Sequence, residues 1–208
     1  YLSTTTIHKY MNKDLNLSAI VMRKKPGYKS CKKHKIFDNL LKQKFNVDEK
    51  NKIWCTDFTY MRQPNGKFRY NCTIMDLFDR SAIASVNSDY INTELAIETL
   101  TEALKKEKPN NGILLHSDQG VQYTSWEFVN FCKDNGVIQS MSKAGCPYDN
   151  APMERFYNTF KNCFYYRYTF ESVEQLDEMT KQYINWYNYV RPHSTNNYMT
   201  PMEFRYRA

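Results

Sequence analysis

Three acidic residues occupy positions at which a carboxylate needs an explanation. Asp57 lies in the middle of the apolar run Ile53–Tyr60, where a carboxylate is costly unless it is paired, hydrogen-bonded or bound to a cation. Asp118 follows the apolar run Ile113–Leu115, and ligands commonly bind at the carboxyl ends of strands in α/β sheets. Glu154 lies in the first turn of an expected helix. Taken singly, each has an ordinary interpretation as a satisfied core group, a turn residue or a helix-dipole partner.

Taken together, the three carboxylates are typical of a site for a hard cation. The six cysteines contain no C-x-x-C pair and the four histidines no H-x-x-x-H pair, so ordinary zinc spacing is absent. Oxygen-only ligands favour Mg²⁺ or Mn²⁺. Two such ions, about 3.5–4 Å apart, activate a water or hydroxyl and stabilise the leaving oxygen in phosphoryl transfer. The carboxylates therefore predict phosphoryl-transfer chemistry with two Mg²⁺ or Mn²⁺ ions in the active site.

The net charge of +7 is concentrated in the first quarter of the chain. Residues 1–50 hold 12 Lys and Arg against 4 Asp and Glu, whereas residues 51–208 hold 17 against 18. Like charges this close repel one another and resist compact packing, which favours an extended arm for a polyanion over a plain solvated surface. The DNA-binding residues expected in this arm are Arg23, Lys24, Lys25, Lys29, Lys32 and Lys33.

Hydrophobic periodicity divides the chain at residue 50. Residues 1–50 are predicted to form a basic, partly helical N-terminal arm, with one or two helices over 3–20 that Ser3 or Thr4 caps, and a short helix near 37–45. Residues 51–208 are predicted to form an α/β domain with strands over 53–60, 68–76, 82–86, 113–115 and 137–140 and helices over 93–106, 125–135, 152–168 and 172–189. Asp149 or Asn150 is expected to cap the third of these helices. This order predicts a mixed five-stranded sheet flanked by helices.

Composition excludes several other classes of protein. No apolar run approaches the ~18 residues of a membrane span, so no membrane partner is expected. The chain opens without a basic segment followed by an apolar one, which argues against a signal peptide. The cysteines are therefore expected to be reduced, as in a cytosol, and not paired as in a disulfide-rich secreted protein.

A series of motifs along residues 50–205 resembles the D-D-35-E integrase core, and within it the transposases of bacterial insertion sequences of the IS-three type. Asp118 and Glu154 have 35 residues between them. The motifs are Trp54-x-Thr56-Asp57, His116-Ser117-Asp118-Gln119-Gly120, Ser140-Met141-Ser142-Lys143, Asp149-Asn150-Ala151-x-x-Glu154, Tyr187-Asn188-x-x-Arg191-Pro192-His193 and Thr200-Pro201-Met202-Glu203-Phe204. One departure is Asn196-Asn197, where the family often has a leucine and a glycine.

The resemblance implies an RNase H-like fold in which Asp57, Asp118 and Glu154 form the catalytic, metal-binding triad. Lys161 stands seven residues after Glu154 on the same helix face. It matches the family's basic position and would contact DNA near the scissile phosphate. Arg155 and Lys143 flank the expected site and are candidates for binding the DNA backbone, with ordinary surface charge as the alternative. Other expected roles lie outside the triad: Asn188 and Arg191 fasten the last helix to the core, and His116 caps its strand.

The function implied by the resemblance is that of a DNA transposase. Cleavage at a transposon end would free a 3′ hydroxyl, which the same site would transfer to another DNA strand. The implied partners are double-stranded DNA, as transposon ends and as target, and at least one further copy of the chain. The first 50 residues resemble the tail of the family's helix-turn-helix region plus its linker, and the implied location is the bacterial cytoplasm, at the nucleoid. Two alternatives remain: a nuclease of the same fold that joins nothing, and a non-catalytic DNA-binding or assembly module.

Overall fold

The computed structural model describes residues 2–17, 35–63, 65–110 and 112–207. They belong to two units, one within residues 1–30 and one within residues 31–208, each described by itself. In the first unit, α1 (Thr4–Lys9) continues into a π-helical turn (Tyr10–Asp14). Ser3 caps α1 by accepting a hydrogen bond from the backbone N–H of Thr6 at 3.2 Å, which confirms the predicted cap.

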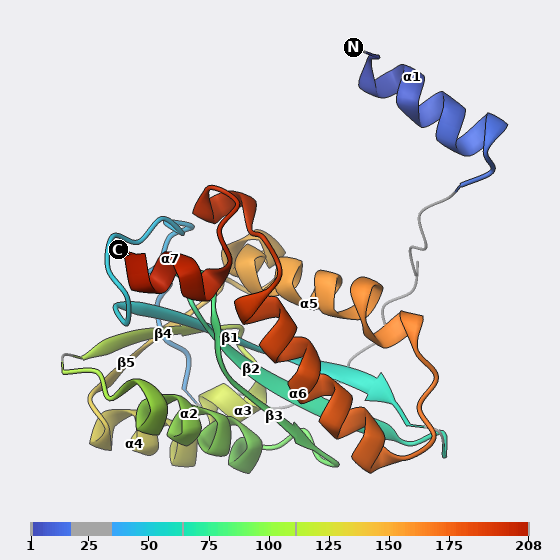
Figure 1. The fold of residues 1–208 in the computed structure, drawn as a ribbon. Coiled ribbons are helices and arrows are strands. Elements are labelled where there is room, and N and C mark those ends of the chain that lie inside the picture. The colour runs from blue at the N-terminus through green and yellow to red at the C-terminus, as the bar shows by residue number, and fades with distance from the viewer. Residues whose placement is uncertain (1, 18–34, 64, 111, 208) are drawn as a thin grey trace. The chain divides into compact units, whose positions relative to one another are not determined.

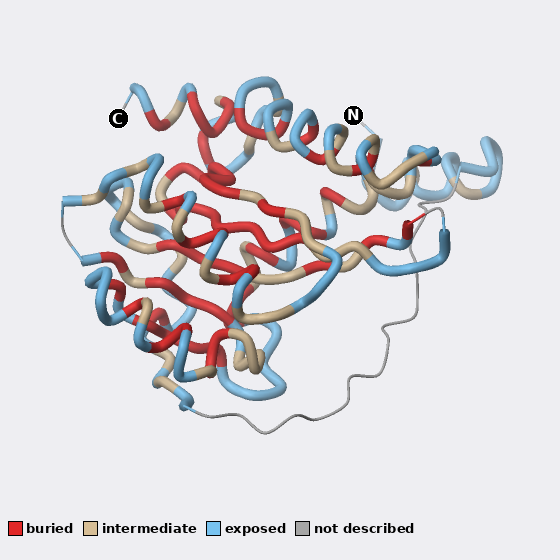
Figure 2. The backbone as a smooth tube through the Cα atoms, turned by 90° about the horizontal axis from the view of Figure 1, so that it is seen from below, coloured by how far each residue is buried: buried red, intermediate tan, exposed pale blue. Residues whose placement is uncertain are grey.

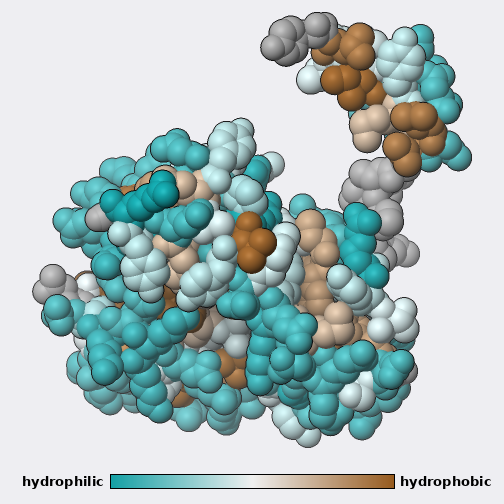
Figure 3. All heavy atoms as spheres, in the orientation of Figure 1, coloured by the Kyte–Doolittle hydropathy of each residue, from teal (hydrophilic) through white to brown (hydrophobic). Residues whose placement is uncertain are grey.

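The helical segment of the first unit exposes its apolar side chains. Figure 3 shows hydrophobic groups gathered on it. Ile7, Tyr10 and Met11 of this segment are exposed, as are Leu2 before it and Leu15 and Leu17 after it. The segment therefore has no core of its own among the described residues.

The second unit is built on a five-stranded sheet in the order β3-β2-β1-β4-β5 (Figure 1). The strands are β1 (Ile53–Arg62), β2 (Phe68–Asp76), β3 (Ala82–Ser88), β4 (Ile113–Ser117) and β5 (Val137–Met141). β1 to β3 form an antiparallel meander, whereas β4 and β5 run parallel to β1. The predicted mixed sheet is confirmed, with each strand end within two residues of its expected position.

Helices cover both faces of this sheet. They are α2 (Thr93–Glu107), α3 (Val121–Thr124), α4 (Trp126–Asp134), α5 (Ala151–Cys163), α6 (Val173–Tyr189) and α7 (Pro201–Arg207). Alternate residues of β1 serve the two faces: Trp54 packs in the cluster that includes Leu100 and Phe128, and Cys55 in the one that includes Phe156 and Tyr183. Figure 2 shows the buried strands between helices whose outer sides are exposed.

One predicted helix of the sheet domain ends early, and two short helices, α3 and α7, were not predicted. α5 ends at Cys163 and not near residue 168, because Phe164 leaves the helical conformation and buries its ring, which stacks on Tyr183 with centroids 5.3 Å apart. A 3-10 turn, Tyr165–Arg167, follows. α7 was not predicted, since its seven residues are too few to show a helical period.

Residues 35–50 pack against the sheet domain, although the sequence assigned them to the arm. The Asp38 carbonyl accepts from Met141 N–H at 3.3 Å, the Ser140 Oγ accepts from Leu40 N–H at 2.9 Å, and Leu41 is buried in the core. The helix expected near 37–45 does not form, because the chain takes hydrogen bonds from β5 and the residues beside it. The compact unit therefore begins before the predicted boundary at residue 50.

The C-terminal segment is fastened to the sheet by side-chain amides. Asn188 accepts from Ala82 N–H and donates to the Ala82 carbonyl, each at 2.9 Å, which confirms its predicted role. Buried Asn196 donates to the Asp79 carbonyl at 2.6 Å. Asn197 has φ +52°, a left-handed conformation that asparagine tolerates better than most residues.

A buried ion network, which sequence inspection missed, joins α7 to the sheet. Arg205 is 5% exposed and donates to Asp76 at 2.9 Å, to Asp79, and to Glu107 of α2. Burial by itself lowers the pKa of Arg205, but Asp79 and Asp76 outweigh that effect and keep the group charged. Removing one member would leave its partners buried without a counter-charge.

Two further findings bear on the predicted classes. Within the described ranges, no helix is long and apolar enough to cross a membrane. The cysteines that the structure describes are free thiols: Cys55, Cys72, Cys132, Cys146 and Cys163.

We expect Arg205→Met to lower the free energy of unfolding by about 3–5 kcal/mol, because it leaves the buried carboxylates of Asp76 and Asp79 without a counter-charge. Urea unfolding followed by circular dichroism measures this change. Arg207→Met, an exposed position in the same helix, is the matched control and should change stability by less than about 0.5 kcal/mol. Equal effects of the two substitutions would contradict a structural role for the network.

Candidate active site

Strand register brings Asp57 and Asp118 to the same end of the sheet. β1 pairs in parallel with β4 through Ile53↔Leu114, Trp54↔Leu115 and Cys55↔His116. Asp57 and Asp118 each follow the last of these pairs by two residues, so they occupy matching positions on one face. Asp57 Oδ1 accepts from Phe58 N–H at 2.7 Å, and Asp118 Oδ1 accepts from Gly120 N–H at 2.8 Å.

The docking of α5 on β1 brings Glu154 to this end. Beyond Cys55, the carbonyls of β1 receive donors from α5: Asn150 Nδ2 bonds the Thr56 oxygen at 3.1 Å, and the Tyr157 hydroxyl bonds the Asp57 oxygen at 2.9 Å. Glu154 lies between these two residues in the first turn. Asn150 stands at the N-cap position but makes no capping hydrogen bond there, since its amide is used on β1, so the predicted side-chain cap was wrong.

The three carboxylates interact electrostatically. The pKa of Asp57 is raised from its ordinary 3.8 to about 8, first by burial and then by the negative charge of Asp118. Glu154 adds to the same effect, whereas the Phe58 N–H and the Lys161 charge oppose it. Concentrated negative charge of this kind, on oxygen donors alone, fits a hard divalent cation by its chemistry.

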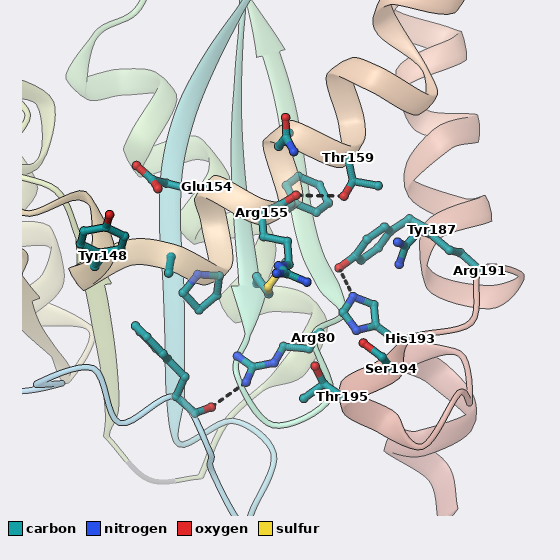
Figure 4. Close-up of a pocket in the computed structure, with 16 residues that line it drawn as sticks. Arg80, Tyr148, Glu154, Arg155, Thr159, Tyr187, Arg191, His193, Ser194 and Thr195 are labelled. Atoms are coloured by element: carbon teal, nitrogen blue, oxygen red, sulfur yellow. Dashed lines mark hydrogen bonds between the residues drawn. The ribbon is translucent and has the colours of Figure 1, made fainter. Parts of the chain in front are cut away.

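The carboxylates nevertheless do not form a closed cluster. Within the ranges that the structure describes, no three His, Cys, Asp or Glu side chains lie close enough to hold a metal ion together. Glu154 is exposed, and Figure 4 shows it pointing away from the loop that carries His193. The donor types fit Mg²⁺ or Mn²⁺, and the side chains would have to converge to coordinate it.

The predicted basic residue of α5 lies beside the carboxylates. Lys161 Nζ is 4.3 Å from the ring centroid of Tyr60 on β1, a cation–π distance. Burial lowers the pKa of Lys161, and the negative charge of Asp57 acts in the opposite direction. Lys161 is thus close enough to Asp57 for each to influence the other.

The other predicted DNA contacts have different surroundings. Lys143 is exposed, and its backbone N–H donates to Asp149 Oδ2 at 2.9 Å. Arg155 is exposed on α5 and lines a cavity beside Glu154 (Figure 4). The arm residues Arg23, Lys24, Lys25, Lys29, Lys32 and Lys33 lie outside the described residues.

Buried polar groups next to the carboxylates link the elements that carry them. His116 was expected to cap its strand; instead it is fully buried and joins β4 to the end of β5, with Nδ1 2.9 Å from Ser140 Oγ and Nε2 3.1 Å from Ser142 Oγ. Burial lowers its pKa to about 4, which leaves the ring neutral at pH 7. Thr56, the residue before Asp57, forms a hydrogen bond of 3.0 Å between its Oγ1 and the Tyr123 hydroxyl.

Models of known families match most of this domain. Two matches, each described as an integrase core domain, cover residues 47–147 and 135–201. A transposase-like protein of Haemophilus influenzae is 35% identical over 173 residues, which are 82% of this chain and 78% of that protein. The chain belongs to the integrase-core family of insertion-sequence transposases.

Longer transposases are similar to the chain over part of their length. The transposase for insertion sequence element IS904 of Lactococcus lactis is 35% identical over 167 residues, 80% of this chain and 66% of that protein. The putative transposase InsK for IS150 of Escherichia coli is 34% identical, over 80% of this chain and 59% of that protein. The integrase-core chain therefore spans less than two thirds of these two relatives.

Solved structures share the fold at low sequence identity. A chain of the simian T-cell lymphotropic virus intasome has a TM-score of 0.67 at 18% identity and covers 87% of this chain and 60% of that one. The HTLV-2 integrase catalytic core domain, solved with magnesium, has a TM-score of 0.61 at 16% identity, over 76% and 97% of the two chains. These likenesses confirm the RNase H-like fold.

We expect the free energy of unfolding of Asp57→Asn to exceed that of the wild type by an amount that grows with pH. In the unfolded chain Asp57 loses its proton near pH 3.8, but in the metal-free folded chain only near pH 8. Between these values the folded state binds more protons, so ionisation costs stability as pH rises. Urea unfolding with EDTA at pH 5, 6.5 and 8 measures the difference, which should be smallest at pH 5. A difference independent of pH would contradict the raised pKa.

Proposed function

We propose that this chain is the catalytic part of a DNA transposase. It would cleave DNA at the ends of an insertion sequence and transfer the freed 3′ hydroxyl to another DNA strand. The observation that carries the proposal is that Asp57 of β1 and Asp118, just after β4, follow the last pair of these strands by the same two residues. The negative charges of Asp118 and of Glu154 both raise the pKa of Asp57. Membership of the integrase-core family supports the same activity.

We assign the three carboxylates as the ligands of Mg²⁺ or Mn²⁺, two ions to a site. When bound, such ions supply Lewis-acid activation of the attacking oxygen and stabilise the leaving oxygen in phosphoryl transfer. Lys161, held against Tyr60 and near Asp57, would contribute positive charge toward the scissile phosphate. Asn150 and Tyr157 would maintain the position of α5 through their bonds to β1.

The partners in this proposal are double-stranded DNA and further copies of the chain. Arg155 and Lys143 flank the site and would bind DNA backbone. Cutting two ends in concert requires at least a dimer. The basic N-terminal arm would bind DNA outside the site through Arg23, Lys24, Lys25, Lys29, Lys32 and Lys33, and such a protein would act in the bacterial cytoplasm at the nucleoid.

A cleavage and strand-joining assay on labelled DNA with the insertion-sequence ends tests the proposal. We expect products only with Mg²⁺ or Mn²⁺, and a loss of about 100-fold or more in Asp118→Asn and in Glu154→Gln, because each removes a ligand charge. Glu127→Gln is the matched control, since Glu127 is also an exposed glutamate in the first turn of a helix, α4. It should retain wild-type activity.

The products distinguish the remaining functions. Metal-dependent cleavage without joined strands, lost in the same variants, would identify a nuclease of this fold. DNA binding with no reaction in any metal would favour the binding or assembly module. Equal activity of Glu154→Gln and Glu127→Gln would contradict the assignment of Glu154 to the site.

A further inference from the structure

A cavity of about 710 Å³ lies beside the first turns of α5 (Figure 4). Its walls come from segments far apart in sequence: the first turns of α5, the end of α6, the loop at 191–195, Arg80 between β2 and β3, and Phe45 of the 35–50 segment. Glu154 lines the same cavity, so it opens beside the candidate active site.

Three arginines converge on this cavity. Arg80, Arg155 and Arg191 all line it, and all three act on His193, lowering its pKa, together with burial, to about 4. A group that feels three guanidinium charges must lie close to each of them. None of the three forms an ion pair with a carboxylate among the described residues. Like charges held together in this way stabilise a bound anion and destabilise the empty pocket.

Two nitrogen atoms of this wall lack hydrogen-bond partners. Arg80 is only 8% exposed; one terminal nitrogen donates to the Phe45 carbonyl at 2.8 Å, whereas the other, Nη1, is buried without a partner among the described residues. The Nδ1 of His193 is likewise buried and without a described partner, while its Nε2 forms a 3.2 Å hydrogen bond with the Tyr187 hydroxyl. Buried polar groups are nearly always satisfied, so orphaned ones in a cavity wall indicate a missing ligand.

We propose that this pocket, formed by Arg80, Arg155, Arg191 and His193, binds a phosphate group of the DNA strand that runs past the active site. Guanidinium groups pair with phosphate oxygens in a fork geometry, and the hydroxyls of Thr159, Ser194 and Thr195 line the same space. The position of the pocket favours a DNA phosphate over a free one. Glu154 lines the same cavity as the arginines, so a DNA strand held at Glu154 would place a neighbouring phosphate close to them. This proposal therefore rests on the proposed action on DNA.

The test is fluorescence anisotropy of a labelled DNA duplex with the whole chain, in EDTA, over a range of salt concentrations. The probe variant is Arg155→Gln/Arg191→Gln, in which neither side chain is fully buried. We expect about tenfold weaker binding and a salt slope smaller by about 2, because two phosphate contacts are lost. Lys181→Gln/Arg207→Gln removes the same charge from exposed positions outside the cavity and should behave nearly as the wild type. Arg155→Lys/Arg191→Lys should restore part of the slope.

A second arm uses inorganic phosphate alone and follows thermal unfolding against chloride at equal ionic strength. Stabilisation by phosphate that Arg155→Gln/Arg191→Gln loses, together with its weaker DNA binding, supports the proposal. Phosphate-dependent stabilisation with unchanged DNA binding would overturn it in favour of a free phosphate ligand. Equal DNA affinity of the probe and control variants, or no DNA binding by the wild type, would also overturn it. The measurement in EDTA keeps the two proposals apart, because a difference in DNA binding between the probe and control variants would stand even if strand transfer is never observed.

Discussion

The seating of α5 on the central strand is the constraint on which the site depends. β1 pairs with β4 through three residues only, whereas its pairing with β2 continues through Asp57↔Thr73 to Arg62↔Phe68. Beyond the last pair with β4, Asn150 at the N-cap of α5 donates to the Thr56 carbonyl, and Tyr157 of α5 donates to the Asp57 carbonyl. Because buried carbonyls are costly to leave unpaired, the bonds that complete the strand also fix the helix, and the helix in turn brings Glu154 to the end of the sheet where Asp57 lies.

Two consecutive residues of α5, Glu154 and Arg155, belong to side-chain clusters of opposite charge. Glu154 adds to the carboxylates and Arg155 to the arginines, since neighbours on a helix point about 100° apart. Both groups concentrate like charge and so lower the stability of the unliganded fold, a cost that functional sites commonly carry. The aromatic core around Phe156 and Tyr183 and the ion network of Arg205 supply stability on the side of the sheet that holds α5 and α6.

Much of the architecture followed from residues close together in the chain. The five strands and the longer helices follow hydrophobic periods within single segments, which depend on local spacing. Asp57 was identifiable because an acidic residue interrupts an apolar strand, and Asp118 because it directly follows one. The 35-residue spacing to Glu154, in a series of further motifs, then pointed to the integrase core.

Contacts between segments far apart in the chain could not be predicted from local sequence patterns. Arg80 joins Arg191 and His193 only because the turn between β2 and β3 packs beneath the loop that follows α6. Residues 35–50 carry the composition of an arm, yet hydrogen bonds from β5 draw them onto the sheet. By itself, therefore, the sequence determined the five strands, the longer helices and the family, and it selected the three carboxylates as candidates. Only the tertiary structure decided which charges lie close together. Burial and proximity shift pKa values and leave polar atoms without partners, and both arise when segments about a hundred residues apart pack together.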